Sequence, residues 1–425
     1  MVEEILLADD FVRQLMSVGE VDILVGVPSF NNAATIGQTV QAVEQSFQQG
    51  FARQRVVLVN VDGGSGDGTR EVVMNTRAEK NSSPTGRGLT SLRTEQRVVT
   101  QYGNAPSAGL ALRTILAAAD LLRAKACAVI SPATLNLTTA WISNLLAPVY
   151  HDKVDFVAPL YNRHKYDGLL SRNLLYPMSR SVFGRGIREL HPSELGFSGR
   201  LATHCLAQDV WSQEDIQDAP EIWMALTAIS SGFNCCQAFL GTKERGAAGT
   251  APDIVTAVRQ NVGSLFWCLD ADEDFWIQRA KPEPVPSIGP VSELTSEPLN
   301  INRERIYDLF RSGVQDLQPI LQTILAPGTM AEIQSAAGQN EEKSLFGGEL
   351  WARTLFEFAA SHHHAVLNRD HLIQALVPLY RGRIHSFLVE HQDSSAEEME
   401  ADTENLCVEF EKQKPYLVER WKAKA

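Results

Sequence analysis

Two stretches decide the fold: residues 22–36, DILVGVPSFNNAATI, and residues 55–69, RVVLVNVDGGSGDGT. Each begins with a run of apolar residues, which favours a buried strand, and then passes into the turn-forming residues Pro, Asn, Gly and Asp. A helical pattern follows each turn, with apolar residues at Ile36, Val40 and Val43 after the first. Strands that alternate with helices predict an α/β fold with a mostly parallel sheet.

The same alternation continues to about residue 160. Ligands of parallel sheets bind outside the carboxyl ends of the strands, so we expect the functional residues directly after the strands. Further strands are predicted at residues 98–102, 126–130 and 154–159, and further helices at 3–17, 107–125 and 141–150.

The C-terminal part of the chain has a different character. Residues 281–300 contain five prolines, which is typical of a linker or an extended segment, and residues 301–425 show helical periodicity almost throughout. We therefore predict an α/β domain at 1–280, a proline-rich linker at 281–300 and a helical C-terminal domain at 301–425. One face of the helical domain could form the interface of a homodimer.

The composition excludes several classes of protein. The 425 residues include 38 Lys and Arg against 51 Asp and Glu, a net charge of −13, which argues against a dedicated nucleic-acid binder. No run approaches the roughly 18 uncharged apolar residues of a membrane span. The first residues lack the basic segment of a secretory signal, and the six cysteines form no CxxC pair, so we expect a cytoplasmic protein with reduced thiols.

The turns after the first two strands are candidate ligand-binding segments. Glycines let a backbone approach a ligand closely, and an acid at a strand end can hold a ribose hydroxyl or a base N–H. The second turn fits neither a P-loop nor a GxGxxG fingerprint. For the first turn, an ordinary strand-to-helix connection is the alternative interpretation. The candidate residues are Pro28, Ser29, Asn31, Asp62, Gly63 and Gly64.

Together, VGVPSFNNAATI (25–36) and VLVNVDGGSGDGT (57–69) resemble the nucleotide-binding half of GT-A glycosyltransferases. Over residues 20–275 the chain is similar to the retaining synthases that make glucosylglycerate or glucosyl-3-phosphoglycerate. The resemblance implies a GT-A fold and transfer of a hexose from a nucleoside-diphosphate sugar to a small hydroxy acid such as glycerate. Further motifs that carry it lie at 155–168, 176–177, 195–201, 221–224 and 237–241.

The chain departs from this family where the family handles the diphosphate. The resemblance implies a divalent metal ion held by an Asp-x-Asp after the fourth strand and by a later His. Here Ser131-Pro132-Ala133 replaces the acids and Arg245 replaces the His, so the metal ligands are missing and we expect no metal. The family's phosphate-binding Lys is also absent from residues 106–109, PSAG.

Two explanations of these losses stay open. In one, Arg245, with Lys243 or Arg163, supplies the positive charge, since a guanidinium binds phosphate in a bidentate manner. In the other, the chain is a catalytically inactive homologue that binds a nucleotide sugar or a protein partner. Loss of charge stabilisation at the leaving diphosphate would raise the activation free energy by several kcal/mol. Each 1.36 kcal/mol slows the reaction about tenfold.

The resemblance also implies roles for individual residues. Glu221, Arg163 and Lys165 are the catalytic candidates, with Glu221 positioning the sugar or the acceptor, because a front-face mechanism with retention needs no separate base. Ser131 and Arg245 join the residues of the two turns as donor-binding candidates. The acceptor-binding candidates are His164, Tyr166, Asp167, Asn173 and Glu194.

Overall fold

The computed structural model describes residues 7–81, 92–96, 107–162, 166–244, 253–279, 281–289, 301–341 and 346–423. The chain forms two compact units, each assembled from several segments of sequence. The first unit takes Met1–Asn162, His191–Ala251 and Val285–Glu293. The second takes Arg163–Leu190, Pro252–Pro284 and Leu294–Ala425.

The units differ from the predicted domain boundaries. We predicted one domain up to residue 280, but residues 163–190 and 252–284 belong to the helical unit. The reason is packing: α6 (Tyr176–Phe183) packs on α17 (Ala396–Lys422), and α10 (Ile254–Ala271) packs on α16 (Arg369–Glu390). The predicted α/β class with a helical C-terminal region is confirmed.

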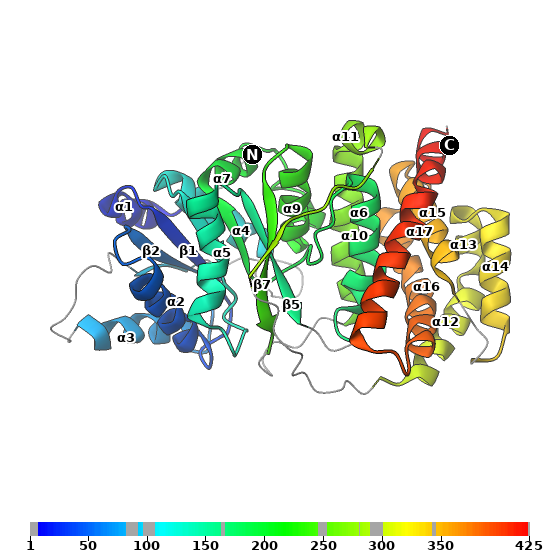
Figure 1. The fold of residues 1–425 in the computed structure, drawn as a ribbon, viewed down its shortest axis with the longest axis horizontal. Helices are drawn as coiled ribbons and strands as arrows, with labels where there is room; N and C mark the ends of the chain where they lie inside the picture. The colour runs from blue at the N-terminus through cyan, green and yellow to red at the C-terminus, as the bar shows by residue number, and fades with distance from the viewer. Residues whose placement is uncertain are drawn as a thin grey trace. The chain divides into compact units, whose positions relative to one another are not determined.

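In the part of the chain that the structure describes, eight strands form one sheet in the first unit, in the order β3-β2-β1-β4-β6-β5-β7-β8. Figure 1 labels β1, β2, β5 and β7 of this sheet. Neighbouring strands are parallel except where β6 takes part, which runs antiparallel to β4 and β5. The strands are β1 (Ile23–Ser29), β2 (Val56–Asp62), β3 (Leu92–Gln96), β4 (Ala126–Val129), β5 (Phe156–Asn162), β6 (Leu195–Ser198), β7 (Cys235–Thr242) and β8 (Ser287–Ile288).

Two predicted segments, the strand at 98–102 and the linker at 281–300, are to be compared with the strands β3 and β8. The strand predicted at 98–102 lies outside the described residues, and β3 at Leu92–Gln96 pairs with β2. Within the predicted linker, Ser287–Ile288 extends the sheet beside β7 as β8. At the start of this pairing, Gln237 N donates to the Pro286 carbonyl oxygen at 2.8 Å.

Helices cover both faces of this sheet (Figure 1). On one face the apolar residues of α2 and α5 share a core with Val25 and Val27 of β1. On the other face α4 approaches β1 so closely that a Cβ at Gly26 would lie 2.6 Å from Ile115. The helices of the first unit are α1 (Asp9–Val18), α2 (Ile36–Gly50), α3 (Thr69–Asn81), α4 (Ala108–Leu121), α5 (Thr139–Asp152), α7 (Gly199–Leu206), α8 (Glu214–Asp218) and α9 (Pro220–Ser230).

The strand order creates a switch point at β1. This strand has β2 on one side and β4 on the other, so the connections after β1 and after β3 leave in opposite directions across the sheet. In open α/β sheets, a crevice forms outside the carboxyl ends of the strands at such a point.

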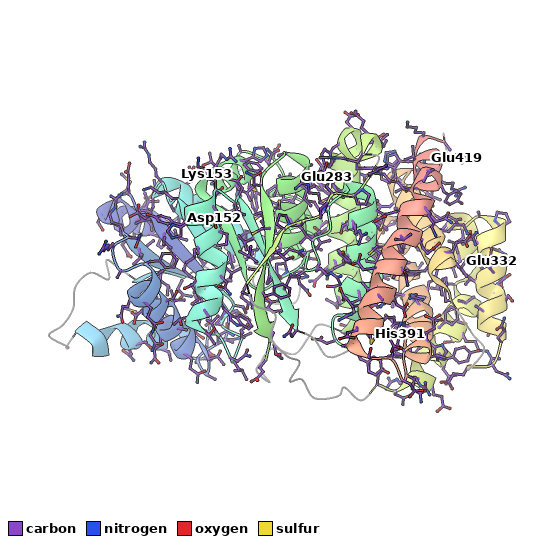
Figure 2. All side chains as sticks on the ribbon, in the orientation of Figure 1. Asp152, Lys153, Glu283, Glu332, His391 and Glu419 are labelled. Atoms are coloured by element: carbon purple, nitrogen blue, oxygen red, sulfur yellow. The ribbon has the colours of Figure 1, made fainter. Side chains whose placement is uncertain are left out.

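The described residues of the second unit are mainly helical. Its interior is aromatic, with Trp276, Trp351, Phe356 and Phe410 fully buried. At the end of α16, where Figure 2 labels His391, its Nε2 lies 2.7 Å from Asp402 Oδ2 of α17. The elements are the π-helical turn η2 (Ser171–Leu175), α6, α10, α11 (Glu273–Gln278), α12 (Arg303–Asp316), α13 (Gln318–Ile324), α14 (Pro327–Gly338), α15 (Gly348–His363), α16 and α17.

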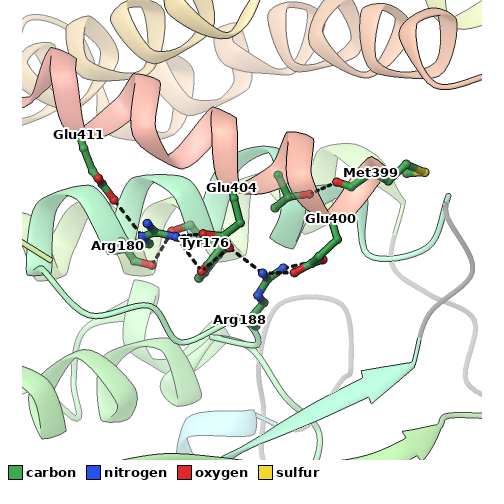
Figure 3. Close-up of polar contacts among 9 residues, drawn as sticks. Tyr176, Arg180, Arg188, Met399, Glu400, Glu404 and Glu411 are labelled. Atoms are coloured by element: carbon green, nitrogen blue, oxygen red, sulfur yellow. Dashed lines mark hydrogen bonds and ion pairs between the residues drawn. The ribbon is translucent and has the colours of Figure 1, made fainter. Parts of the chain in front are cut away.

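A network of charges joins α6 to α17 within this unit (Figure 3). Arg180 contacts Glu404 and also lies 2.8 Å from Glu411. The Arg188 guanidinium lies 4.5 Å from the ring centroid of Tyr176, whose hydroxyl lies 3.1 Å from Glu404 Oε1. Burial alone would raise the pKa of Glu404. This effect is outweighed by hydrogen bonds from Arg180 and Tyr176 and by the charge of Arg188, so the pKa of Glu404 is lowered. None of the helices described for either unit is long and apolar enough to cross a membrane.

Candidate functional site

A cavity of about 240 Å³ lies where β1, β2 and β4 end. This is the switch point of the sheet, where a ligand site is expected. The residues that line the cavity come from the two strand ends, from the first turn of α4 and from the turn after β4: Pro28, Ser29, Phe30, Asn32, Val61, Asp62, Gly63, Ser107, Ala108, Leu110, Ala111, Ser131, Pro132 and Ala133.

Five of the predicted donor-binding residues therefore lie around one cavity. They are Pro28, Ser29, Asp62, Gly63 and Ser131. They come together because β1 pairs in parallel with β2, in register from Ile23 and Val56 to Ser29 and Asp62, and with β4 on its other side.

The carboxylate of Asp62 organises the turn after β2. Its side chain is fully buried, and Oδ1 accepts from the backbone N–H groups of Gly64 at 3.0 Å and Ser65 at 2.8 Å. Oδ2 accepts from the hydroxyls of Ser29 at 2.9 Å and Ser65 at 2.7 Å. Both oxygens are thus engaged within the protein, and Asp62 shapes the cavity wall through the backbone that it holds.

Further hydrogen bonds fasten the turns after β1 and β2 to each other. Asn31, at a positive φ of 53°, donates its backbone N–H to Ser65 Oγ at 2.8 Å and accepts from Gly66 N at 3.0 Å through its side chain. Gly63 N donates to the Ser29 carbonyl oxygen at 2.8 Å. The side chain of Asn31 therefore supports the two turns from outside the cavity lining.

Asp67 makes a second connection between the same turns. Its Oδ2 accepts from Ala33 N at 2.9 Å, and its Oδ1 accepts from Thr69 N at 3.0 Å. Burial disfavours the charged carboxylate, but the hydrogen bonds from Thr69 and Ala33 outweigh burial and lower the pKa of Asp67. Asn32 N in turn donates to Thr69 Oγ1 at 2.8 Å. The site is preorganised because its backbone is held at many points.

The sequence interpretation missed part of the lining. Asn32 lines the cavity, whereas its neighbour Asn31 was the residue proposed from sequence. The first turn of α4 was considered only as the place of the family's phosphate-binding Lys, at residues 106–109, and was not proposed as lining, although Ser107 before an Ala- and Leu-rich run is a helix-start signal. Ser107 caps α4 by accepting from Leu110 N at 3.1 Å. The lining residues that were not named as individual candidates are Phe30 and Asn32 of the turn after β1, together with Val61, Ser107, Ala108, Leu110 and Ala111.

The residues at the end of β4 do not fit a divalent metal ion of the kind that the family resemblance implies. Ser131, Pro132 and Ala133 bring a single side-chain oxygen, and this Ser131 Oγ accepts from Ala133 N at 3.2 Å. Asp62 is the one carboxylate among the described residues that line the cavity, and its oxygens each accept two hydrogen bonds. Mg²⁺ and Mn²⁺ require oxygen ligands, preferably carboxylates.

Glu194 is enclosed by partners from three other parts of the first unit. Its side chain is fully buried, and Oε1 accepts from Thr134 Oγ1 at 2.6 Å. Oε2 accepts from the Tyr161 hydroxyl and from Lys243 Nζ, the latter at 2.6 Å. The predicted acceptor-binding role of Glu194 stays a prediction, and its carboxylate is engaged within the protein.

Glu221 lies at the start of α9, beside His191. Its Oε2 is 3.6 Å from His191 Nε2 and has no hydrogen-bond partner among the described residues. Burial raises the pKa of Glu221, and the charge of His191 opposes this shift. A carboxyl group in this setting holds a proton more readily and can donate a hydrogen bond, which is compatible with positioning a ligand.

Three predicted acceptor residues belong to the second unit. Tyr166 OH donates to the His391 carbonyl oxygen at 3.4 Å, and Asp167 Oδ1 accepts from Gly168 N at 2.8 Å. Asn173 is fully buried, and its Oδ1 accepts from Arg383 Nε at 3.1 Å. Asn173 thus serves the interior of its own unit. The predicted residues Arg163, His164, Lys165 and Arg245 lie outside the described residues.

Comparison with known proteins gives weak matches only. No family model and no curated protein matches the sequence. Among solved structures, the chain is similar to glucosyl-3-phosphoglycerate synthase from Mycobacterium tuberculosis. Its complex with phosphoglyceric acid is 15% identical, with a TM-score of 0.42, over 62% of this chain and 84% of that chain.

Two further complexes of that synthase match similarly. The one with Mn²⁺, uridine diphosphate and glucosyl-3-phosphoglycerate is 16% identical, with a TM-score of 0.43, over 62% of this chain and 84% of that chain. The one with Mn²⁺ and uridine-diphosphate-glucose is 16% identical, with a TM-score of 0.42, over 60% and 82% of the two chains. These values are too low to place the chain in that family, so the chain's own residues carry the functional argument.

Proposed function

We propose that this chain is a GT-A-type glycosyltransferase and that its cavity holds the nucleoside part of a nucleoside-diphosphate sugar. The observation that carries the proposal is the cavity at the switch point of the sheet, walled by the preorganised turns after β1 and β2. Its volume of about 240 Å³ is below the roughly 300–1,000 Å³ of pockets that enclose a whole drug-sized ligand. We therefore assign only the nucleoside to it, with the diphosphate and sugar outside.

The polarity of the lining supports the same assignment. Phe30, Val61 and Leu110 offer apolar surface to the flat base, and Asn32 and Ser131 offer an amide and a hydroxyl. Ligand sites of this type combine mostly apolar walls with a few polar groups that fix orientation.

The proposed reaction transfers a hexose to a small hydroxy acid such as glycerate, with retention. The bond between the anomeric carbon and the diphosphate oxygen breaks, and the acceptor hydroxyl oxygen bonds to that carbon on the same face. The hydroxyl proton passes to the departing diphosphate, so no separate protein base is required. In this proposal Glu221 positions the sugar or acceptor, Arg163 and Lys165 bind the acceptor's carboxylate, and Arg245 binds the diphosphate.

A second candidate function is a catalytically inactive homologue that binds the nucleotide sugar or a protein partner. The observation that favours it is the wall after β4, where Ser131, Pro132 and Ala133 supply no carboxylate for a metal ion. A departing diphosphate without a counter-charge forfeits several kcal/mol of transition-state stabilisation. Ligand binding can survive such a loss when transfer does not.

The test is thermal unfolding with a panel of nucleotide sugars, each with Mn²⁺ and with chelator. A ligand at about 100 times its Kd stabilises by roughly 2.7 kcal/mol, and we expect one donor to raise Tm equally in both conditions. Ala111→Phe should abolish the shift because Ala111 lines the cavity, whereas Ala117→Phe on the same helix should preserve it.

The outcomes separate the two candidates. Binding followed by formation of a glycosylated hydroxy acid supports the transferase. Binding without transfer to any acceptor supports the inactive homologue. If no donor raises Tm, or if Ala111→Phe leaves the shift intact, the cavity is not the nucleoside site.

A further inference from the structure

Glu194 and Lys243 form a buried ion pair next to the cavity. The side chain of Glu194 is fully buried and that of Lys243 is 7% exposed, and their charged atoms lie 2.6 Å apart. Lys243 Nζ also lies 5.1 Å from the ring centroid of Tyr161. A charge this deeply buried requires its partner, because truncation of either one leaves an uncompensated charge in the interior.

The pair connects the ends of four strands. Lys243 directly follows β7, Tyr161 is in β5, and Glu194 directly precedes β6. Through its other oxygen, Glu194 accepts from Thr134 Oγ1 at 2.6 Å, and Thr134 belongs to the turn after β4. The ion pair is therefore bonded directly to the segment that contributes Ser131, Pro132 and Ala133 to the cavity.

One backbone hydrogen bond and two bonds of the Asn136 side chain join the turn after β4 to the end of β7. Leu135 N donates to the Glu244 carbonyl oxygen at 2.9 Å. Asn136 Nδ2 donates to the Thr242 carbonyl oxygen at 2.6 Å, and Asn136 Oδ1 accepts from Glu244 N at 3.0 Å. Leu135 and Asn136 are thus bonded to residues 242–244, and Thr134 is connected to Lys243 through Glu194.

We propose that Glu194 and Lys243 are positioning residues of the cavity, and that their ion pair fixes the wall after β4 without a divalent cation. Each group has a defined part: Lys243 neutralises Glu194, and Glu194 holds Thr134, two residues beyond Pro132. The inference rests on the proposed function because it concerns the same cavity. It also gives Lys243 a role other than binding the diphosphate, since its charge is balanced by Glu194.

The proposal predicts how hydrogen exchange changes in the absence of any ligand. In Lys243→Met, the amides of Leu135 and Glu244 should exchange at least tenfold faster, relative to the amides of β1 and β2. In the wild-type chain, Mn²⁺ and chelator should leave the exchange of these amides unchanged.

Lys125→Met is the matched control. Lys125 pairs with Asp22 at 2.8 Å, just before β4 and β1, at the ends of these strands opposite to the cavity. It is the same substitution at an exposed lysine, 63% accessible, so it should leave the exchange of Leu135 and Glu244 unchanged. The double variant Glu194→Gln/Lys243→Met removes both charges and retains a side chain that can accept from Thr134, so it should restore at least half of the lost protection on a logarithmic scale.

Binding of uridine diphosphate, with guanosine diphosphate as a second probe, extends the test. Lys243→Met should weaken binding at least tenfold, Lys125→Met should not, and chelator should not affect the wild-type Kd. The exchange experiment is run without ligand, so it decides the inference even when neither nucleotide binds. Failure of the whole panel of nucleotide sugars contradicts the proposed function and leaves the exchange result standing. Unchanged exchange in Lys243→Met, no rescue in the double variant, or protection that depends on Mn²⁺ would each overturn the inference.

Discussion

Replacement of Asp62 by alanine tests whether this carboxylate builds the cavity wall. The variant removes the acceptor of two backbone N–H groups, at Gly64 and Ser65, and of two hydroxyls. The hydroxyls can turn to other partners, but the N–H groups cannot. A buried donor without an acceptor costs about 1–3 kcal/mol of stability. Because this turn is half-buried, we assign a cost of roughly 1–2 kcal/mol to each of the two N–H groups. The expected loss in the free energy of unfolding is therefore about 2–4 kcal/mol.

Urea denaturation gives the loss for Asp62→Ala, and an exposed aspartate provides the comparison. Asp253 accepts from Val255 N at 2.9 Å and Thr256 N at 3.1 Å as the N-cap of α10. Removal of such a cap costs about 1 kcal/mol. If Asp62→Ala costs no more than Asp253→Ala, the carboxylate does not hold the turn and the reasoning is wrong. The free energy of unfolding of Asp62→Asn should lie between those of the wild type and Asp62→Ala, because the amide oxygen of Asn can still accept from both N–H groups.

Three further predictions concern packing and charge. Gly26→Val should cost about 1–3 kcal/mol, since a Cβ there would lie 2.6 Å from Ile115, and Ile115→Ala in the same chain should recover part of the loss. Burial lowers the pKa of Lys414 from its ordinary 10.5 to about 8, so between these values the unfolded chain holds a proton that the folded chain has lost. The free energy of unfolding should therefore rise with pH in that window, and the rise should vanish in Lys414→Met. Arg180→Ala should cost about 1–3 kcal/mol in urea denaturation, because it leaves the half-buried Glu404 without this partner.

Each of these variants has a matched control elsewhere in the chain. Gly66→Val places its side chain where no atom lies within 4 Å of the new Cβ, so it should cost less than Gly26→Val. Lys412→Met removes an exposed lysine of α17 and should retain the pH-dependent rise. Arg13→Ala breaks an exposed pair and should change stability little. Equal effects of any variant and its control would contradict the corresponding prediction.

The sequence predicts the central strands well because their apolar runs are buried throughout. The prediction of a strand at residues 55–61 corresponds to β2 at Val56–Asp62, which is buried along its whole length. The antiparallel strand β6 was missed as a strand, because Leu195–Ser198 is too short for periodicity to identify. The strand β3 was missed because Leu92–Gln96, LRTEQ, is mostly polar.

The candidate site was predictable where it consists of consecutive residues after a strand. The turns at 28–31 and 62–64 have turn-forming composition, and the structure places them together. The enclosure of Glu194 was not predictable, because its partners Thr134, Tyr161 and Lys243 are distant in sequence and meet only through the strand order. The same holds for α4, whose first turn reaches the cavity because α4 packs on β1 and β2.

The division of the chain into interleaved units has a consequence for its synthesis. The helical unit draws on residues 163–190 and 252–284, but their packing partners α16 and α17 are made more than 80 residues later and so emerge from the ribosome after them. Until then the apolar faces of α6 and α10 have no α16 or α17 to cover them, and such intermediates are prone to aggregation and to chaperone binding. A chain stopped near residue 300 should therefore accumulate in insoluble form or on chaperones, even though every strand of the described sheet has already been made.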